Sequence, residues 1–147
     1  MLPTLTGDGP HIVHASAVAV GGRGLMITGA SGSGKSSLAL QLISLGATLV
    51  SDDRVVLRQR REGGVFMTAP GTIRGQIEAR GIGVLNAASA PAMLATIVDL
   101  DQAETQRFPQ RHCHMIGSEA FPVIRRVENP AFASMLLVYL KGGRLSP

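Results

Sequence analysis

The segment Gly29-Ala30-Ser31-Gly32-Ser33-Gly34-Lys35-Ser36 constrains the fold of this chain more than any other part of its sequence. It meets the pattern G-x-x-x-x-G-K-[ST], in which a glycine-rich turn brings backbone N–H groups toward phosphate oxygens at the start of a helix. The run Leu25-Met26-Ile27-Thr28 precedes it as a candidate strand, and Lys35 to Leu45 follows it as a candidate helix that ends before Gly46. This order of strand, loop and helix is the context that the pattern needs. We therefore expect a P-loop that binds the phosphates of ATP.

The last two residues of this loop have chemical roles in that prediction. The Lys35 ammonium would neutralise the β- and γ-phosphates, and the Ser36 hydroxyl would be a ligand of Mg²⁺. The alternative is a glycine-rich turn that contains a lysine by chance, which the flanking strand and helix disfavour. A second carboxylate is still needed to hold a metal or move a proton, and Asp52-Asp53 at the end of the next strand offers one. The alternative for Asp52-Asp53 is an ordinary Asp-rich turn without a functional role.

Composition narrows the class of protein. The 147 residues suit one domain, predicted over 1–147, and 45% hydrophobic against 16% charged residues indicates a globular core. The net charge of +4 would suit nucleic acid, but only 3% of residues are aromatic, so nucleic-acid binding is not expected. A single cysteine, Cys113, and a first segment without a signal core favour the cytoplasm. The apolar runs are too short to cross a membrane.

Local patterns predict a sheet-rich chain with two helices. Ala15 to Val20 and Leu25 to Thr28 are typical of a hairpin around a glycine turn, and further strands are expected at 48–51, 55–57, 65–67 and 92–100. The stretch 70–86 is left unassigned, and the polar stretch 101–119 is expected to be a loop. A C-terminal helix is predicted after Asn129, with Pro130 in its first position. Its apolar stripe consists of Phe132, Met135, Leu136, Tyr139 and Leu140.

Four features at matching separations resemble the catalytic domain of HPr kinase/phosphorylase, over about 14–140. HPr kinase/phosphorylase is the bacterial enzyme that phosphorylates a serine of the phosphocarrier protein HPr in the phosphotransferase system. The features are His14, the loop 29–36 followed by Ser37-Leu38-Ala39-Leu40, the triplet Asp52-Asp53-Arg54, and the block Ile77-Glu78-Ala79-Arg80-Gly81-Ile82-Gly83. The last block is similar to the signature of that family.

The resemblance implies an α/β fold, a P-loop domain with a mixed, strand-rich sheet like that of phosphoenolpyruvate carboxykinase. It implies an ATP-dependent protein serine kinase, with ATP and Mg²⁺ as cofactors and HPr as the protein partner. Catalytic roles follow for His14, Lys35, Asp53 and Arg107. Asp53 matches the proton carrier with His14 beside it, and Arg107 matches a later catalytic arginine more loosely. Ser36 and Glu78 match the metal site, although without the family Glu78 and Arg80 would be interpreted as a solvated ion pair.

Several points stay open at this level. The N-terminal regulatory domain of long family members has no counterpart here, so a short form is expected, and Ser37 stands where the family usually has glutamate. The sequence leaves open the family's hexamer, its phosphorylase activity, and which of Asp52 and Asp53 carries the proton. On an extended strand the two would point to opposite faces. A small-molecule P-loop kinase or ATPase, and a nucleotide-binding sensor without turnover, remain the alternatives.

Overall fold

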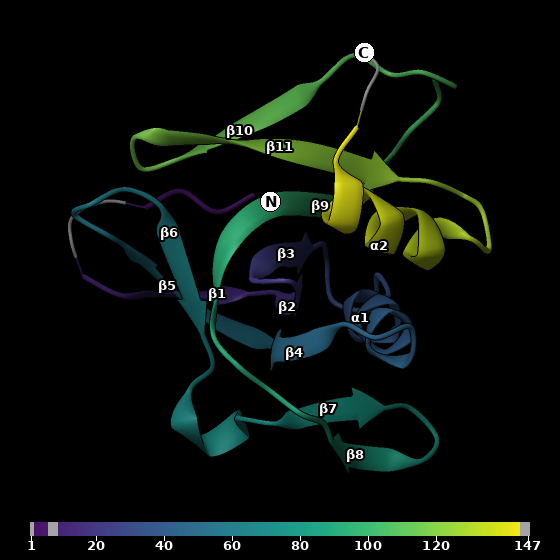
Figure 1. The fold of residues 1–147 in the computed structure, drawn as a ribbon. Coiled ribbons are helices and arrows are strands. Elements are labelled where there is room, and N and C mark those ends of the chain that lie inside the picture. Colours follow the sequence, from purple (N-terminus) through teal and green to yellow (C-terminus); the bar gives the residue numbers. More distant parts are fainter. Residues whose placement is uncertain (1, 6–8, 145–147) are drawn as a thin grey trace.

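The computed structural model describes residues 2–5 and 9–144, and Figure 1 shows how their strands and helices are arranged. The elements of the first half are β1 (His11–His14), β2 (Ser16–Val20), β3 (Arg23–Thr28), α1 (Lys35–Ser44), β4 (Thr48–Ser51), β5 (Arg54–Gln59) and β6 (Val65–Thr68). The elements of the second half are the 3-10 turn η1 (Gly71–Ile73), β7 (Gln76–Ala79), β8 (Gly83–Asn86), β9 (Ala92–Ala103), β10 (His112–Ile116), β11 (Glu119–Arg126) and α2 (Phe132–Gly142). The fold is therefore mixed α/β and rich in strands.

Strand β9, with 12 residues, organises the main nine-stranded sheet. One of its edges pairs in parallel with β3, and its other edge pairs with β6 near its start and in parallel with β11 near its end. The other strand pairs are antiparallel. Because β3, β9 and β11 run in the same direction, their carboxyl ends meet at one edge of the sheet. Thr28 and Arg125 both lie opposite Asp99 in the register.

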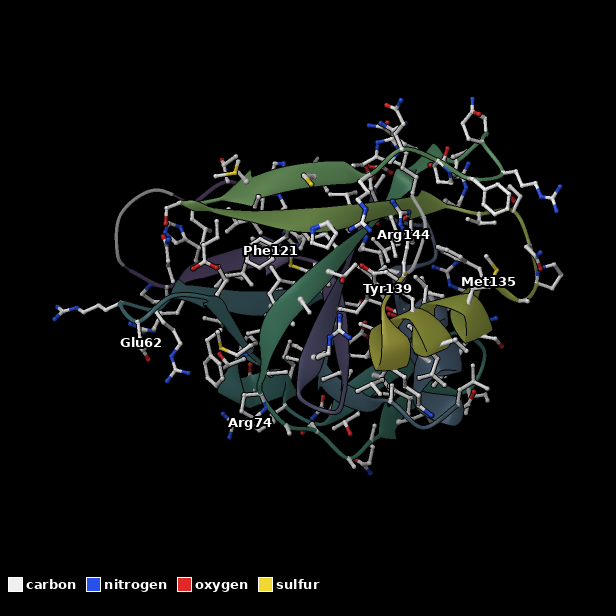
Figure 2. All side chains as sticks on the ribbon, turned by 45° about the horizontal axis from the view of Figure 1, so that its top comes forward. Glu62, Arg74, Phe121, Met135, Tyr139 and Arg144 are labelled. Carbon is white, nitrogen blue, oxygen red and sulfur yellow. The ribbon has the colours of Figure 1, made fainter. Side chains whose placement is uncertain are left out.

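The two helices cover the same face of the sheet and pack against each other (Figure 1). Alternating residues of β3 divide between two apolar clusters: Leu25 and Ile27 face the helices, and Met26 faces the opposite cluster. On α2, Leu136 and Leu140 are buried, whereas Met135 is 44% exposed. Figure 2 shows Met135 and Tyr139 on this helix. Among the described residues, no helix is long and apolar enough to cross a membrane.

The predicted hairpin, the helix after the loop and the strands at 48–51, 55–57, 65–67 and 92–100 are confirmed, with small shifts at their ends. The expectation of a loop over 101–119 is wrong. Strand β9 continues to Ala103, and β10 pairs with β11 in a hairpin whose alternating half-exposed residues made it look polar. The C-terminal helix begins at Phe132 rather than Pro130, because Phe132 N donates to Asn129 O at 2.9 Å in a tighter turn ahead of it. The Asn129 Oδ1 accepts the Ala131 N–H at 2.8 Å, which is the side-chain contact expected of a capping residue.

Residues 70–86, which the sequence left unassigned, form η1 and the separate β7–β8 hairpin. Ile77 on β7 is only 1% exposed and packs in the cluster that contains α1. The next residue, Glu78, points to the other side of the strand and is exposed. The hairpin is thus fixed beside α1 by one face and presents Glu78 on the other.

Candidate functional site

The glycine-rich loop (29–36) connects β3 to α1 and needs its glycines. The φ angles of Gly29, Gly32 and Gly34 are 152°, 81° and 100°, in a region that side chains other than glycine rarely adopt. A Cβ on Gly29 would also lie 2.5 Å from the Ser33 Oγ. The first intrahelical bond runs from Leu38 N to Gly34 O at 3.0 Å, so the preceding amides at the start of α1 lack helical acceptors. These N–H groups are suited to an anion.

Lys35 lies over this loop. Its Nζ donates to the carbonyl oxygens of Gly29 and Ala30 at 2.9 and 3.0 Å. The Ala30 N–H donates to Asp101 Oδ1 at 2.9 Å, which ties the loop to the end of β9. That hydrogen bond, together with the Lys35 charge, holds the pKa of Asp101 below its usual range. The loop is therefore anchored by a carboxylate that the sequence reasoning missed.

Asp52 joins three elements around the loop through its carboxylate and is only 6% exposed. Its Oδ1 accepts the hydroxyls of Ser16 and Ser36, both at 2.7 Å, and its Oδ2 accepts the Glu78 N–H at 3.0 Å. Because Ser36 donates its hydroxyl proton to Asp52, the lone pairs of its oxygen remain to bind a cation. Asp52 thus orients Ser36. The sequence indicated the Asp pair but not these contacts, since Ser16 and Glu78 lie far away along the chain.

Asp53 occupies a strained three-residue turn. Its φ of 68° is the only positive value outside glycine among the described residues, and Arg54 N donates to Asp52 O at 2.8 Å across it. Its side chain is 73% exposed. The expectation that the two aspartates lie on an extended strand is therefore wrong, because β4 ends at Ser51 and the backbone reverses at Asp53. Strain of this kind clusters at functional sites, and Asp tolerates it better than most residues.

A cavity of about 260 Å³ brings most of the predicted site together. Its described lining consists of Ser31, Gly32, Gly34, Lys35, Ser36, Ser37, Asp53, Glu78 and Arg80. The cavity thus combines a lysine, a hydroxyl, backbone amides and two carboxylates, which can hold phosphate groups and a hard cation next to a proton acceptor.

His14 and Arg107 are not among the described residues that line this cavity. His14 is exposed at the end of β1, opposite Arg54 in the register, and Ala15 N donates to Asp53 O at 3.2 Å. Arg107 lies between β9 and β10, with its guanidinium 5.2 Å from the Phe108 ring centroid, and lines a different cavity. His14 is thus near Asp53 along the backbone, whereas Arg107 is not brought to the glycine-rich loop.

A second, wider cavity of about 450 Å³ adjoins the first on the other side of the loop. One wall consists of Ser33, Gly34, Ser37, Leu38 and Gln41, and the other consists of the segment 126–130, which starts at the last residue of β11. Gly34 and Ser37 line both cavities. The two cavities together extend across the carboxyl ends of β3, β9 and β11, where open α/β sheets bind ligands.

Residues 9–95 match the family model of the HPr Serine kinase C-terminal domain. The HPr kinase/phosphorylase of Geobacillus sp. (strain WCH70) is 47% identical over 74 residues, and that of Listeria monocytogenes serotype 4a (strain HCC23) is 42% identical over 74 residues. In both cases the match covers 50% of this chain but only 24% of the relative. The chain therefore spans about a quarter of the length of the curated relatives it matches.

The fold is similar to that of the Hpr(Ser) kinase/phosphatase from Coxiella burnetii, with a TM-score of 0.74 over 89% of this chain and 94% of that chain, at 21% identity. The matched family region contains the glycine-rich loop, both aspartates and Glu78, and the structural likeness extends beyond it. The chain belongs to the family of the HPr Serine kinase C-terminal domain.

Proposed function

We propose that this chain is an ATP-dependent protein kinase that phosphorylates a serine of HPr, and that 1–147 form a single catalytic P-loop domain of the phosphoenolpyruvate-carboxykinase-like kind. The names of its relatives, HPr kinase/phosphorylase, support the reaction and the partner. The geometry of the glycine-rich loop supports the binding of the ATP phosphates. ATP is the phosphoryl donor in this proposal.

One observation carries the proposal: the Asp52 carboxylate holds the Ser36 hydroxyl while Asp53 lies in the same cavity as Lys35. A simple anion site would need the loop and the lysine only. A phosphoryl-transfer site also needs an oriented metal ligand and a proton acceptor beside the phosphates. The two neighbouring aspartates provide one group for each need, since Asp52 is buried and bonded and Asp53 is open to the cavity.

The donor set fits Mg²⁺. The described residues contain no group of three or more His, Cys, Asp or Glu side chains that could hold a metal. Mg²⁺ commonly binds through one or two carboxylates, with waters and substrate phosphate oxygens completing its ligands. Ser36 and Glu78 would hold it, with Asp52 orienting Ser36 from behind. A bound Mg²⁺ would neutralise negative charge on the phosphates.

In the proposed reaction, Asp53 accepts the proton of the HPr serine hydroxyl as that oxygen attacks the γ-phosphorus of ATP, and ADP leaves with the electrons of the broken bond. Lys35 and the loop amides stabilise the charge on the transferred group and on ADP. In the phosphorylase reaction, an oxygen of inorganic phosphate would attack the phosphorus of phosphoserine, the bond from that phosphorus to the serine oxygen would break, and pyrophosphate would form while Asp53 returned the proton to the serine oxygen. We include this phosphorylase reaction in the proposal as a related transfer at the same carboxylate, with phosphate in place of ADP as the acceptor.

The roles of His14 and Arg107 stay predictions, as does a homo-oligomer like the family's hexamer. His14 could act on Asp53 through the β1–β2 junction, which bonds to the Asp53 carbonyl. Arg107 needs a rearrangement of the segment between β9 and β10, or a neighbouring copy of the chain, to meet the phosphates.

Incubation of the purified chain with ATP labelled in the γ-phosphate and with HPr tests the proposal. We expect label on HPr with the wild-type chain and none with Lys35→Ala, which removes the side-chain cation of the loop. Release of free labelled phosphate without labelled HPr would indicate an ATPase. Binding of ATP without either product would indicate a sensor.

A further inference from the structure

A cavity of about 290 Å³ beside α2 gathers arginines from three parts of the chain. Arg107 comes from the segment between β9 and β10, Arg125 from the end of β11, and Arg144 from the segment after α2. Figure 2 labels Arg144 and also Met135, the residue of α2 that lines this cavity. The described lining shares no residue with the smaller cavity at the glycine-rich loop. The three arginines therefore gather outside the proposed phosphate site.

The charge of this cavity is positive. Glu104 is the acidic residue of the described lining, and its Oε1 lies 3.2 Å from His112 Nε2. Its Oε2 accepts the N–H groups of Thr105 and Gln106 at 3.0 and 3.2 Å, so both oxygens already have partners. Three guanidiniums against one carboxylate leave an excess of two positive charges. Among the residues that the structure describes, none of the three arginines is in an ion pair. A cavity lined by one sign of charge concentrates ions of the opposite sign, so this one suits a dianion.

The segment that carries Arg107 is held at its base. The Glu104 N–H donates to a backbone oxygen of β11 at 2.8 Å, and the contact between Glu104 and His112 closes the segment from one end to the other. Arg125 and Arg144 are half-buried. Guanidiniums on an ordered and partly dehydrated wall lose less entropy when they bind a carboxylate or a phosphate than free surface arginines do.

Apolar side chains form much of the remaining described lining, namely those of Pro109, Val123, Ile124, Val127 and Met135. Val123 is 8% exposed and Met135 is 44% exposed. Such a surface favours a ligand with an apolar part over a bare inorganic ion, and the volume is at the small end of ligand pockets. We propose that this cavity binds a small organic dianion, with its carboxylates or phosphate on the arginines and its apolar part on these side chains.

Calorimetry with two dianionic probes and a neutral one tests this proposal. Phthalate carries two carboxylates on an aromatic ring, phenyl phosphate carries one phosphate monoester, and phenol has the ring without these charges. Arg125→Gln and Arg144→Gln each remove one guanidinium, and Arg144 follows the last helix, so its replacement should leave the fold intact. Arg111→Gln is the matched control, because Arg111 is an exposed arginine between β9 and β10 that is not in the described lining. Lys35→Ala reports binding at the glycine-rich loop instead.

We expect at least one dianion to bind the wild-type chain with a Kd below about 1 mM, and phenol to bind at least about tenfold more weakly. Loss of a charge-assisted contact should raise the Kd of that dianion by about tenfold in Arg125→Gln and in Arg144→Gln. The Kd in Arg111→Gln and in Lys35→Ala should stay within about twofold of wild type. The probe that binds more tightly identifies the charged group that the cavity prefers.

Three results would overturn the proposal. They are no binding of either dianion, equal binding of phenol, and a wild-type Kd in both Arg125→Gln and Arg144→Gln. Affinity that is lost in Lys35→Ala but kept in those two variants would place the probe at the glycine-rich loop. None of these measurements depends on phosphoryl transfer by the chain, so the proposed function can fail while this proposal holds, and the reverse.

Discussion

Replacement of Asp52 by Asn should damage either the stability of the chain or its use of Mg²⁺, depending on how the amide is oriented, because the carboxylate accepts three hydrogen bonds in a buried position. An amide cannot accept all three. If the Asn oxygen takes the place of Oδ1, the two serine hydroxyls stay bonded, but the amide nitrogen faces the Glu78 N–H and leaves a donor without an acceptor. One unsatisfied buried donor costs about 1–3 kcal/mol.

If the Asn side chain takes the opposite orientation, no buried donor is left unsatisfied, but the binding of Mg²⁺ is affected. The amide oxygen would accept the Glu78 N–H, and the amide nitrogen would donate to the hydroxyl oxygens of Ser16 and Ser36. Ser36 would then accept that hydrogen bond with one of its lone pairs and turn its own proton toward the cavity, where a cation should bind. Loss of such an orienting partner typically weakens metal affinity by about 10–100-fold.

The assay combines urea unfolding with a Mg²⁺ titration of kinase activity. We expect Asp52→Asn to lower the free energy of unfolding by about 1–3 kcal/mol, or to raise the half-maximal Mg²⁺ concentration by about tenfold or more. The matched control is Asp53→Asn, which has an exposed side chain and a residue type that tolerates positive φ, so its stability should change by less than about 0.5 kcal/mol. An Asp52→Asn variant with wild-type stability and a wild-type Mg²⁺ curve would refute the reasoning.

Four further variants test other contacts. Asp53→Asn should slow transfer to HPr by about 10²–10⁴ while calorimetry finds ATP affinity retained; near-normal transfer would exclude Asp53 as the base. Glu78→Gln should raise the half-maximal Mg²⁺ concentration, since an amide is a poorer ligand of a hard cation than a carboxylate, and an unchanged curve would return Glu78 to a surface role. Asp101, whose pKa is lowered by the Ala30 N–H, contributes stability that is present above about pH 4 and lost as pH falls through that lowered pKa. Asp101→Asn should therefore lower the free energy of unfolding by less than about 1 kcal/mol at pH 7, with the difference from wild type disappearing in acid; a difference independent of pH would contradict this. Arg107→Ala should reduce transfer to HPr without changing ATP affinity, and normal transfer would remove Arg107 from the mechanism.

Local signals explain which parts of the fold could be predicted. The glycines of the loop, the strand before it and the helix after it are adjacent in sequence, and each is favoured by its own residues. The β2–β3 hairpin was likewise indicated by two apolar runs around glycines. These elements depend little on distant contacts, so the sequence alone sufficed.

Pairing between distant strands explains what could not be predicted. Strand β10 looks polar in sequence because only alternate residues turn inward, and it exists because β11 pairs with it and with β9. The parallel neighbours of β9 also create the wider cavity at their carboxyl ends. No local pattern indicates either arrangement.

The candidate site likewise combines residues that local sequence patterns indicate with contacts that depend on distant parts of the chain. Lys35, Asp53 and Glu78 were predicted and line one cavity, with the family resemblance needed for Glu78. The bond between Ser36 and Asp52 depends on where β4 ends relative to α1, and the anchoring of Ala30 by Asp101 depends on the parallel pairing of β3 with β9. Neither contact could be predicted from the sequence, because each depends on how distant segments are placed in space.

The central claim is that this site transfers the γ-phosphoryl group of ATP to a serine of HPr. Mass spectrometry of HPr after incubation with the chain, ATP and Mg²⁺, followed by peptide mapping, tests it most directly. We predict one added phosphate on a serine with the wild-type chain, and none with Lys35→Ala at equal protein concentration. Unmodified HPr in the presence of a folded wild-type chain that binds ATP would contradict the claim.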